Sequence, residues 1–241
     1  MIDRPQQIEK RLSLLKSNIH DFARKVNLSG DDITLVCVTK FAAPEDVLTI
    51  IRLGEMSLGE NRVQDAGKKI EFIKQSTEPE LFKKINWQLI GHLQTNKAKK
   101  AVAIFDLIQS VDSIALAEII SSQAAKENKD FRILIQVNIS REESKFGITP
   151  ESANTFVAQL IKLPRMRLEG LMGISPIVKD PELARPFYRE LNEIYKKTNE
   201  FLMKNNCPQM RILSMGMTND YGVAIEEGSN MVRIGSAIFG G

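Results

Sequence analysis

The stretch ITLVCVTKFAA, residues 33–43, joins a nearly continuous apolar run to a turn that contains no glycine. Such a run is typical of a parallel strand that is covered by helices on both faces. A helix is expected directly after the turn, because Pro44 suits its first position and Glu45 and Asp46 follow in its first turn. The stretch therefore predicts one strand followed by one helix.

The same pattern recurs along the whole chain. Apolar runs that predict strands lie at residues 33–38, 56–58, 87–90, 106–109, 131–137, 168–172, 211–213 and 231–234. Segments that predict helices follow the first seven runs, at 44–53, 62–75, 96–104, 113–128, 150–163, 181–205 and 221–227. Strands that alternate with helices are parallel and are joined by right-handed crossovers.

Eight such units in 241 residues fit a closed barrel better than an open doubly wound sheet. The open sheet, which is the alternative, would leave two edges unprotected and would usually carry a Gly-rich turn after its first strand. The last strand has no helix after it, but a helix expected at 5–26 precedes the first strand and can fill this gap. We predict an α/β fold, a (β/α)8 TIM-type barrel with an extra N-terminal helix, as a single domain over residues 1–241.

Composition narrows the classes of partner. The net charge of +3 and the aromatic fraction of 6% argue against a nucleic-acid-binding surface. No apolar run is long enough to span a membrane, and residues 1–16 lack the apolar core of a signal peptide. Cys37 and Cys207 form neither a disulfide framework nor, with two distant histidines, a metal site. We expect a cytoplasmic protein without metal, membrane or nucleic-acid partners.

Lys40 is the first candidate for chemistry. Active sites of barrels lie at the C-terminal ends of the strands, and Lys40 comes directly after the first predicted strand. A desolvated amine has a lowered pKa and attacks carbonyl groups, so Lys40 could form a Schiff base. The alternative is a lysine that simply extends to solvent. Glu60 and Arg62, after the second strand, are expected to be loop charges that are solvated or that pair with helix ends.

The loops after the last two strands predict a phosphate site. They read SMGMT at residues 214–218 and GS at 235–236. Barrels often bind phosphate with these two loops, and small residues with hydroxyl groups allow close approach of an anion. The alternative is that glycine and serine only serve tight turns.

A phosphate site opposite a reactive lysine suggests a cofactor that is both an aldehyde and a phosphate, and pyridoxal 5'-phosphate (PLP) is such a molecule. Arg233, the only charged residue of the last strand, is the candidate partner of its pyridine nitrogen. An arginine there would leave that nitrogen unprotonated. The alternative is an arginine that points outward to a helix carboxylate.

Six runs of the sequence resemble the pyridoxal phosphate homeostasis proteins (the YggS/PROSC type), in order and over essentially the whole chain. They are VTK (38–40), GENRVQ (59–64), WQLIGHLQTNK (87–97), SKFGI (144–148), LSMGMT (213–218) and VRIGSAIFG (232–240). The resemblance implies a barrel like the N-terminal domain of alanine racemase. It also implies that PLP is held as an aldimine on Lys40, and it makes Lys145 a second, less securely placed lysine.

The resemblance further implies a set of residues that contact the cofactor. They are Asn61, Ser214, Met215, Arg233, Gly235 and Ser236. Ser214, the backbone around Met215, and Gly235 with Ser236 would contact the phosphate. Arg233 would lie near the pyridine nitrogen, and Asn61 near the ring.

Members of this family are regarded as PLP carriers or regulators that affect vitamin B6 and amino-acid pools, without an established reaction. We therefore expect a PLP-binding protein rather than an enzyme, monomeric, with PLP-dependent apo-enzymes as possible recipients. The alternative is a PLP-dependent amino-acid racemase. That reaction needs a second acid or base, which related racemases take from an additional domain. Tyr221 and His92 are the remaining candidates here, whereas Tyr188 and Tyr195 have the spacing of a packing stripe.

Overall fold

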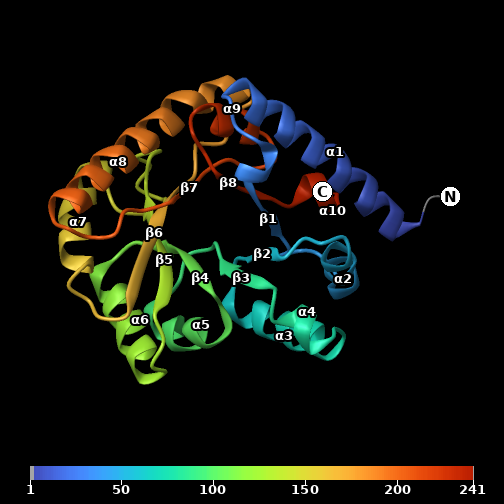
Figure 1. The fold of residues 1–241 in the computed structure, drawn as a ribbon, viewed down its shortest axis with the longest axis horizontal. Helices are drawn as coiled ribbons and strands as arrows, with labels where there is room; N and C mark the ends of the chain where they lie inside the picture. Colours follow the sequence, from blue (N-terminus) through green and yellow to red (C-terminus); the bar gives the residue numbers. More distant parts are fainter. Residues whose placement is uncertain (1–2, 241) are drawn as a thin grey trace.

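Eight parallel strands form a closed barrel in a computed structural model that describes residues 3–240 (Figure 1). Neighbouring strands pair in chain order, and the ring closes where β1 pairs with β8, with Thr34 opposite Met231. The strands are β1 (Thr34–Val38), β2 (Ser57–Glu60), β3 (Asn86–Leu89), β4 (Leu107–Val111), β5 (Phe131–Val137), β6 (Met166–Gly173), β7 (Ile212–Ser214) and β8 (Met231–Ile234). The predicted barrel is confirmed, and the open sheet is wrong because β1 and β8 leave no edge.

Helices cover the outside of the barrel, and Figure 1 shows α8, α9 and α1 in an arc on one side with α5 and α6 on the other. The helices are α1 (Arg4–Lys25), α2 (Pro44–Arg52), α3 (Val63–Gln75), α4 (Pro79–Phe82), α5 (Ala98–Ile104), α6 (Ile114–Lys126), α7 (Ala153–Leu160), α8 (Arg185–Lys204), α9 (Tyr221–Glu226) and α10 (Ser236–Phe239). Short 3-10 turns are η1 (Gly30–Asp32), η2 (Thr95–Lys97), η3 (Pro150–Ser152) and η4 (Pro181–Ala184). Within residues 3–240 no helix combines the length and the apolar character that crossing a membrane requires.

The strands separate two apolar layers, which explains their continuous apolar runs. Leu107, Leu134 and Met172 pack together in one cluster, whereas their chain neighbours Ile108 and Ile135 belong to the larger cluster shared with the helices. Successive side chains of a strand point to opposite faces, so the smaller cluster lies inside the barrel. Strands with both faces covered in this way need few polar residues.

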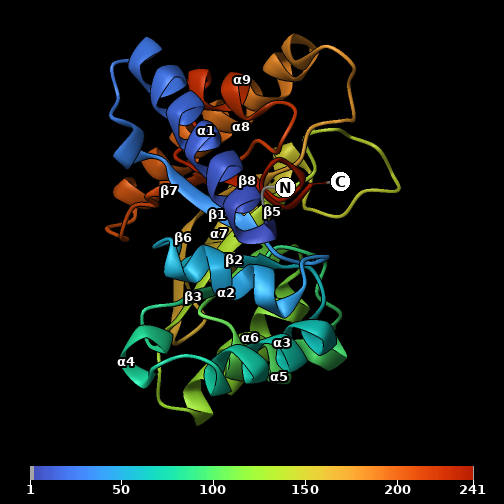
Figure 2. The ribbon, with the colours of Figure 1, turned by 90° about the vertical axis from the view of Figure 1, so that its right-hand side faces the viewer.

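Helix α1 takes the place of the missing eighth outer helix, as predicted. Ile8, Leu12, Leu15 and Ile19 form its buried stripe. The helix packs against α2, α9 and the short α10, and Figure 2 shows it alongside α9. Asp3 caps its first turn by accepting a hydrogen bond from the backbone N–H of Gln6. The guanidinium of Arg4 donates to the carbonyl oxygen of Phe239 at 2.7 Å, so the start of α1 lies beside α10 at the barrel mouth.

Candidate functional site

A cavity of about 660 Å³ opens at the C-terminal ends of the strands. The loops after β1, β2, β3, β6, β7 and β8 line it, together with the first turn of α1. The structure brings five of the predicted site residues to this cavity. They are Lys40, Asn61, Arg233, Gly235 and Ser236. The strand ends that the sequence analysis identified as candidates for chemistry thus meet in one place.

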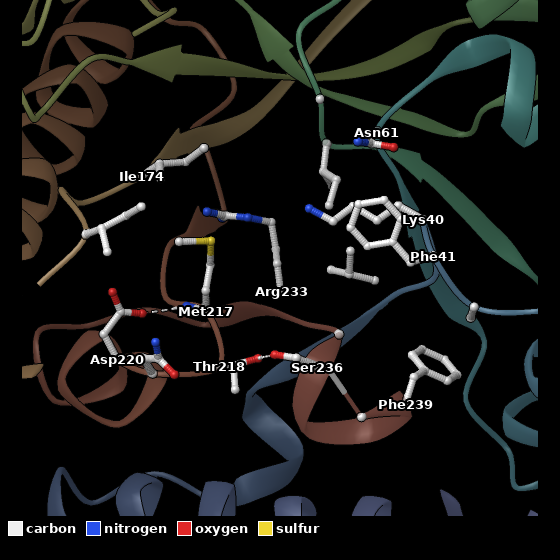
Figure 3. A pocket seen from close by; sticks show the side chains of 18 of the residues that line it. Lys40, Phe41, Asn61, Ile174, Met217, Thr218, Asp220, Arg233, Ser236 and Phe239 are labelled. Carbon is white, nitrogen blue, oxygen red and sulfur yellow. Dashed lines mark hydrogen bonds between the residues drawn. The ribbon is translucent and has the colours of Figure 1, made fainter. Parts of the chain in front are cut away.

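Lys40 enters the cavity from a tight turn after β1. The turn closes where the backbone N–H of Ala42 donates to the carbonyl oxygen of Thr39, at 2.9 Å. The side chain of Lys40 is exposed, and its amine lies 5.0 Å from the centre of the Phe41 ring. The expected desolvation of this amine is therefore absent, although the amine does face the cavity (Figure 3).

Arg233 lies beside Lys40 but in a very different setting. It sits on β8 opposite Val36 of β1, and only 4% of the residue is exposed. Its guanidinium donates to Ser214 Oγ at 2.6 Å and to the carbonyl oxygen of Gly173 at 2.9 Å. Burial lowers the pKa of Arg233 to about 10. The guanidinium therefore stays charged at neutral pH, and the alternative of an outward-pointing side chain is wrong.

A chain of hydrogen bonds continues from Arg233 across the inside of the barrel. Ser214 Oγ donates to Gln109 Oε1 at 2.7 Å, and Gln109 Nε2 donates to Gln88 Oε1 at 2.6 Å. All three side chains are fully buried. Gln88 and Gln109 were missed by the sequence analysis, although a glutamine inside an apolar run that predicts a strand is a signal for such a network.

Ser214 and Met215, expected to contact a phosphate, do not line the cavity. Ser214 is the last residue of β7 and points into the barrel, and Met215 is buried in the core. The chain then turns at Gly216, which has a φ of +94° and would place a Cβ 2.6 Å from that of Ala224. Because of this turn, Met217, Thr218 and Asn219 reach the cavity instead of Ser214 and Met215.

Two hydroxyl groups from different loops meet at one end of the cavity. Ser236 Oγ donates to Thr218 Oγ1 at 3.0 Å, and Figure 3 shows this pair below Lys40 and Arg233. Gly235 allows the second loop to lie directly on β1, since a Cβ there would be 2.9 Å from the carbonyl oxygen of Val38. The predicted pairing of the last two loops is present, with Thr218 as its member from the first loop.

Asp220 fixes the shape of the loop that carries Thr218. Its Oδ1 accepts the backbone N–H of Met217 at 2.7 Å. Its Oδ2 accepts hydrogen bonds from Ser175 at 2.9 Å and from the hydroxyl of Tyr188 at 2.8 Å. Burial, reinforced by the Asp220 charge, raises the pKa of Tyr188, which therefore remains a donor. Tyr188 does pack in the core, but it also supports the cavity wall.

The other acid–base candidates lie elsewhere. His92 Nδ1 is 3.2 Å from Asp112 Oδ2, and its ring stacks on Phe146 at 3.6 Å. Tyr221 packs edge-on against Phe22 of α1. Neither residue lines the cavity, and neither does Lys145. Among residues 3–240, the cavity lining contains no histidine and no tyrosine.

The lining has a positive balance of charge. Three cations, Arg4, Lys40 and Arg233, face one carboxylate, Asp220. Arg4 is partly neutralised by Asp46, whose carboxylate it contacts at 2.7 Å. A small anion that carries an electrophilic carbon would meet an amine, a fixed guanidinium and two hydroxyl groups here.

Comparisons with known proteins agree with this architecture. A family model described as "Alanine racemase, N-terminal domain" matches residues 11–241. The pyridoxal phosphate homeostasis protein of Pasteurella multocida is 34% identical over 233 residues, which cover 97% of each chain. PipY of Synechococcus elongatus, solved with PLP bound, has a TM-score of 0.80 at 28% identity and covers 97% of this chain and 100% of its own.

An alanine racemase of Clostridium difficile shares the fold alone. Its TM-score is 0.67 at 17% sequence identity. The match covers 96% of this chain but only 56% of the racemase. The barrel is thus shared with a longer protein, which has further sequence outside the matched region.

Proposed function

The chain belongs to the alanine racemase N-terminal domain family and, within it, to the pyridoxal phosphate homeostasis proteins, and from this premise we propose that it binds and carries PLP on Lys40. One observation carries the proposal. The Lys40 amine and the buried Arg233 guanidinium face one cavity, with the hydroxyl pair of Thr218 and Ser236 beside them. PipY, a relative at 28% identity, has been solved with PLP bound.

The residues present fit the cofactor in size and in chemistry. A cavity of about 660 Å³ is within the range of small-molecule sites. PLP carries a phosphate, a pyridine nitrogen and an aldehyde, and the lining offers hydroxyl donors, a buried cation and a primary amine. When bound, the cofactor supplies an aldehyde carbon that a primary amine can attack reversibly.

Each lining residue then has a distinct task. Lys40 would hold the aldehyde end, and its amine is exposed to solvent. Ser236, assigned to the phosphate from the sequence, would donate a hydrogen bond to it, and Thr218 would take the place of Ser214 in that role. Arg233 would donate to the pyridine nitrogen, and Asn61 would lie near the ring. Because a guanidinium is a donor, it would leave that nitrogen unprotonated and the ring a weak electron sink.

This arrangement supports carriage rather than racemisation. Racemisation requires an acid or base on the face of the cofactor opposite the lysine. In the described part of the chain the cavity lining offers neither histidine nor tyrosine for that task, and Asp220 already accepts three hydrogen bonds. Release and reloading of PLP need only a reachable amine and a phosphate anchor.

We further propose that the chain acts as a single domain and a monomer, in the cytoplasm, with PLP-dependent apo-enzymes as recipients. The two cysteines are unpaired, which suits a reducing compartment. Transfer of PLP from the loaded protein to an apo-enzyme, measured by recovery of that enzyme's activity, tests the recipients. Sedimentation velocity tests the monomer, and a dimer that persists on dilution would overturn it.

The central experiment is absorption spectroscopy of the protein with PLP, followed by borohydride reduction and peptide mass mapping. We expect a visible absorption band and a pyridoxyl label on Lys40, both lost in Lys40→Ala. Lys99→Ala, which removes an exposed lysine of α5, is the matched control. A label that persists in Lys40→Ala, or that spreads over surface lysines, would overturn the proposal. Sustained turnover of an amino acid by the loaded protein would overturn the carrier function.

A further inference from the structure

A buried ion pair lies directly behind the Lys40 turn. Lys69 of α3 places its Nζ 2.7 Å from Oε1 of Glu60, at the end of β2. The side chains are only 10% and 0% exposed. Glu60 was expected to be a solvated loop charge or the partner of a helix end, and both expectations are wrong, because it is buried and pairs with Lys69 in the middle of α3.

The pair is joined to the residue that precedes Lys40. Lys69 Nζ also donates to the carbonyl oxygen of Thr39. The hydroxyl of Thr39 donates to Glu60 Oε1 at 2.6 Å. The backbone N–H of Thr39 donates to Gly59 at 2.9 Å, as expected for neighbouring strands. Every polar group of Thr39 is thus held, and all three of these bonds lead to β2 or α3.

Stability alone gives a poor account of this ion pair. Burying two charges carries a desolvation penalty that their attraction often fails to offset. In addition, Glu60 Oε2 is buried and has no hydrogen-bond partner among the described residues. A buried polar atom without a partner is rare in folded proteins and calls for an explanation, of which a role at a functional site is one.

We propose that Lys69 and Glu60 are positioning residues, which fix the backbone from which Lys40 enters the cavity. The inference rests on the proposed function of Lys40. The Lys40 side chain has four rotatable bonds and a single aromatic contact, so its own contacts do not define where its amine lies. The position of its Cα sets the region that the amine can reach, and that position follows from the hydrogen bonds that hold Thr39. Displacement of a reacting group by about 1 Å can reduce a rate by about 100-fold.

The test compares variants of α3 and β2. Lys69→Met with Glu60→Gln removes both charges without leaving a buried carboxylate unpaired. Lys69→Arg keeps a donor that can reach both acceptors. Lys68→Met, which changes the exposed neighbour on the same helix, is the matched control. The rate of borohydride-trapped labelling of Lys40 by PLP is measured per folded molecule, well below the unfolding temperature.

We expect the double variant to label Lys40 about tenfold more slowly, in the range that misplacement of a reacting group produces. Lys69→Arg should restore most of the rate, and Lys68→Met should not change it. The affinity for pyridoxine 5'-phosphate, which has the ring and the phosphate but no aldehyde, should stay the same. Hydrogen exchange of the Ala42 amide, measured without any ligand, should become faster in the double variant.

Three outcomes would overturn the positioning role. They are an unchanged labelling rate, an equal loss of pyridoxine 5'-phosphate affinity, and an equal effect of Lys68→Met. The wild-type protein separates this proposal from the preceding one. If its Lys40 is not labelled at all, both fail, whereas a labelled wild type with an unchanged rate in the double variant overturns the positioning role alone.

Discussion

Lys40, in the turn after β1, and Arg233, on the neighbouring β8, are two cations of one cavity with opposite surroundings. Arg233 is almost wholly buried and donates to Ser214 and Gly173. Lys40 is exposed and lies against one aromatic ring. The fixed cation can orient a ligand, and the free one can react with it and release it. A carrier needs both properties within one cavity.

The two charges also differ in their effect on the free energy of unfolding. Burial lowers the pKa of Arg233 to about 10, so its charge is destabilising in the folded protein. An exposed amine keeps its hydration and has no such penalty. The barrel retains a buried charge at a cost to stability, as proteins commonly do at functional sites. Substitutions at Arg233 and beside Lys40 can therefore change the affinity for PLP and the free energy of unfolding independently.

The largest effect is expected for Arg233→Met. The affinity for PLP should fall on the order of 100-fold, because a charge-assisted donor to the ligand is lost. The free energy of unfolding should stay within about 1 kcal/mol of the wild-type value or rise, because the variant no longer buries a charge. Absorbance titration and urea unfolding measure the two quantities, with the exposed Arg211→Met as control. A variant that binds normally, or that loses several kcal/mol of stability, would contradict the comparison.

The next effect concerns the hydroxyl pair. Thr218→Val with Ser236→Ala should weaken PLP binding about tenfold, the loss expected for hydrogen bonds to a charged group. Binding of pyridoxal, which lacks the phosphate, should not change. Absorbance titration with PLP and with pyridoxal gives the ratio of the two affinities for each variant.

Ser214→Ala is the matched control for that prediction. Ser214 acts through Arg233 and not on the phosphate, so its loss should weaken PLP and pyridoxal equally. A loss confined to PLP would restore the direct phosphate contact that the sequence suggested for Ser214 and would remove Thr218 from that role.

The fold could be predicted because its signals are local. Each strand is an apolar run and each helix an amphipathic one, and eight repeats without a Gly-rich first turn leave the closed barrel as the better solution. The strand ends also locate the cavity, which is why Lys40, Arg233 and Ser236 were found. Predicting these residues requires only the rule that active sites of barrels lie at the C-terminal ends of the strands.

The remaining site residues depend on the path of the chain after a strand ends. Whether Ser214 or Thr218 reaches the cavity is decided by the turn at Gly216 and by the bond from Met217 to Asp220. The spacing of apolar residues along the sequence does not indicate where such a turn directs the chain. The burial of Glu60, expected to be solvated or paired with a helix end, was missed for the same reason, since it depends on a helix that packs over the end of β2.

A smaller effect is expected from pH. The pKa of Arg233 is lower in the folded protein than in the unfolded chain, so the unfolded chain binds more protons above about pH 10. The free energy of unfolding of the wild type should therefore rise relative to that of Arg233→Met, by roughly 1 kcal/mol between about pH 9.5 and 11. Denaturant unfolding of both proteins across this range measures the difference. A constant difference would mean that Arg233 is hydrated in solution and not buried as in the structure.

The smallest effect is expected at the rim beside Lys40. Phe41 and Ile177 line the mouth of the cavity and are 90% and 92% exposed. Because they bury little apolar surface, Phe41→Ser and Ile177→Ser should each change the free energy of unfolding by less than about 0.5 kcal/mol. The exposed Leu14→Ser of α1 is the control for a generic surface substitution. A loss above about 1 kcal/mol at either rim position, on the scale of a buried apolar side chain, would mean that the loops close over Lys40 in solution. The contrast between a free lysine and a fixed arginine would then hold only for an open form of the protein.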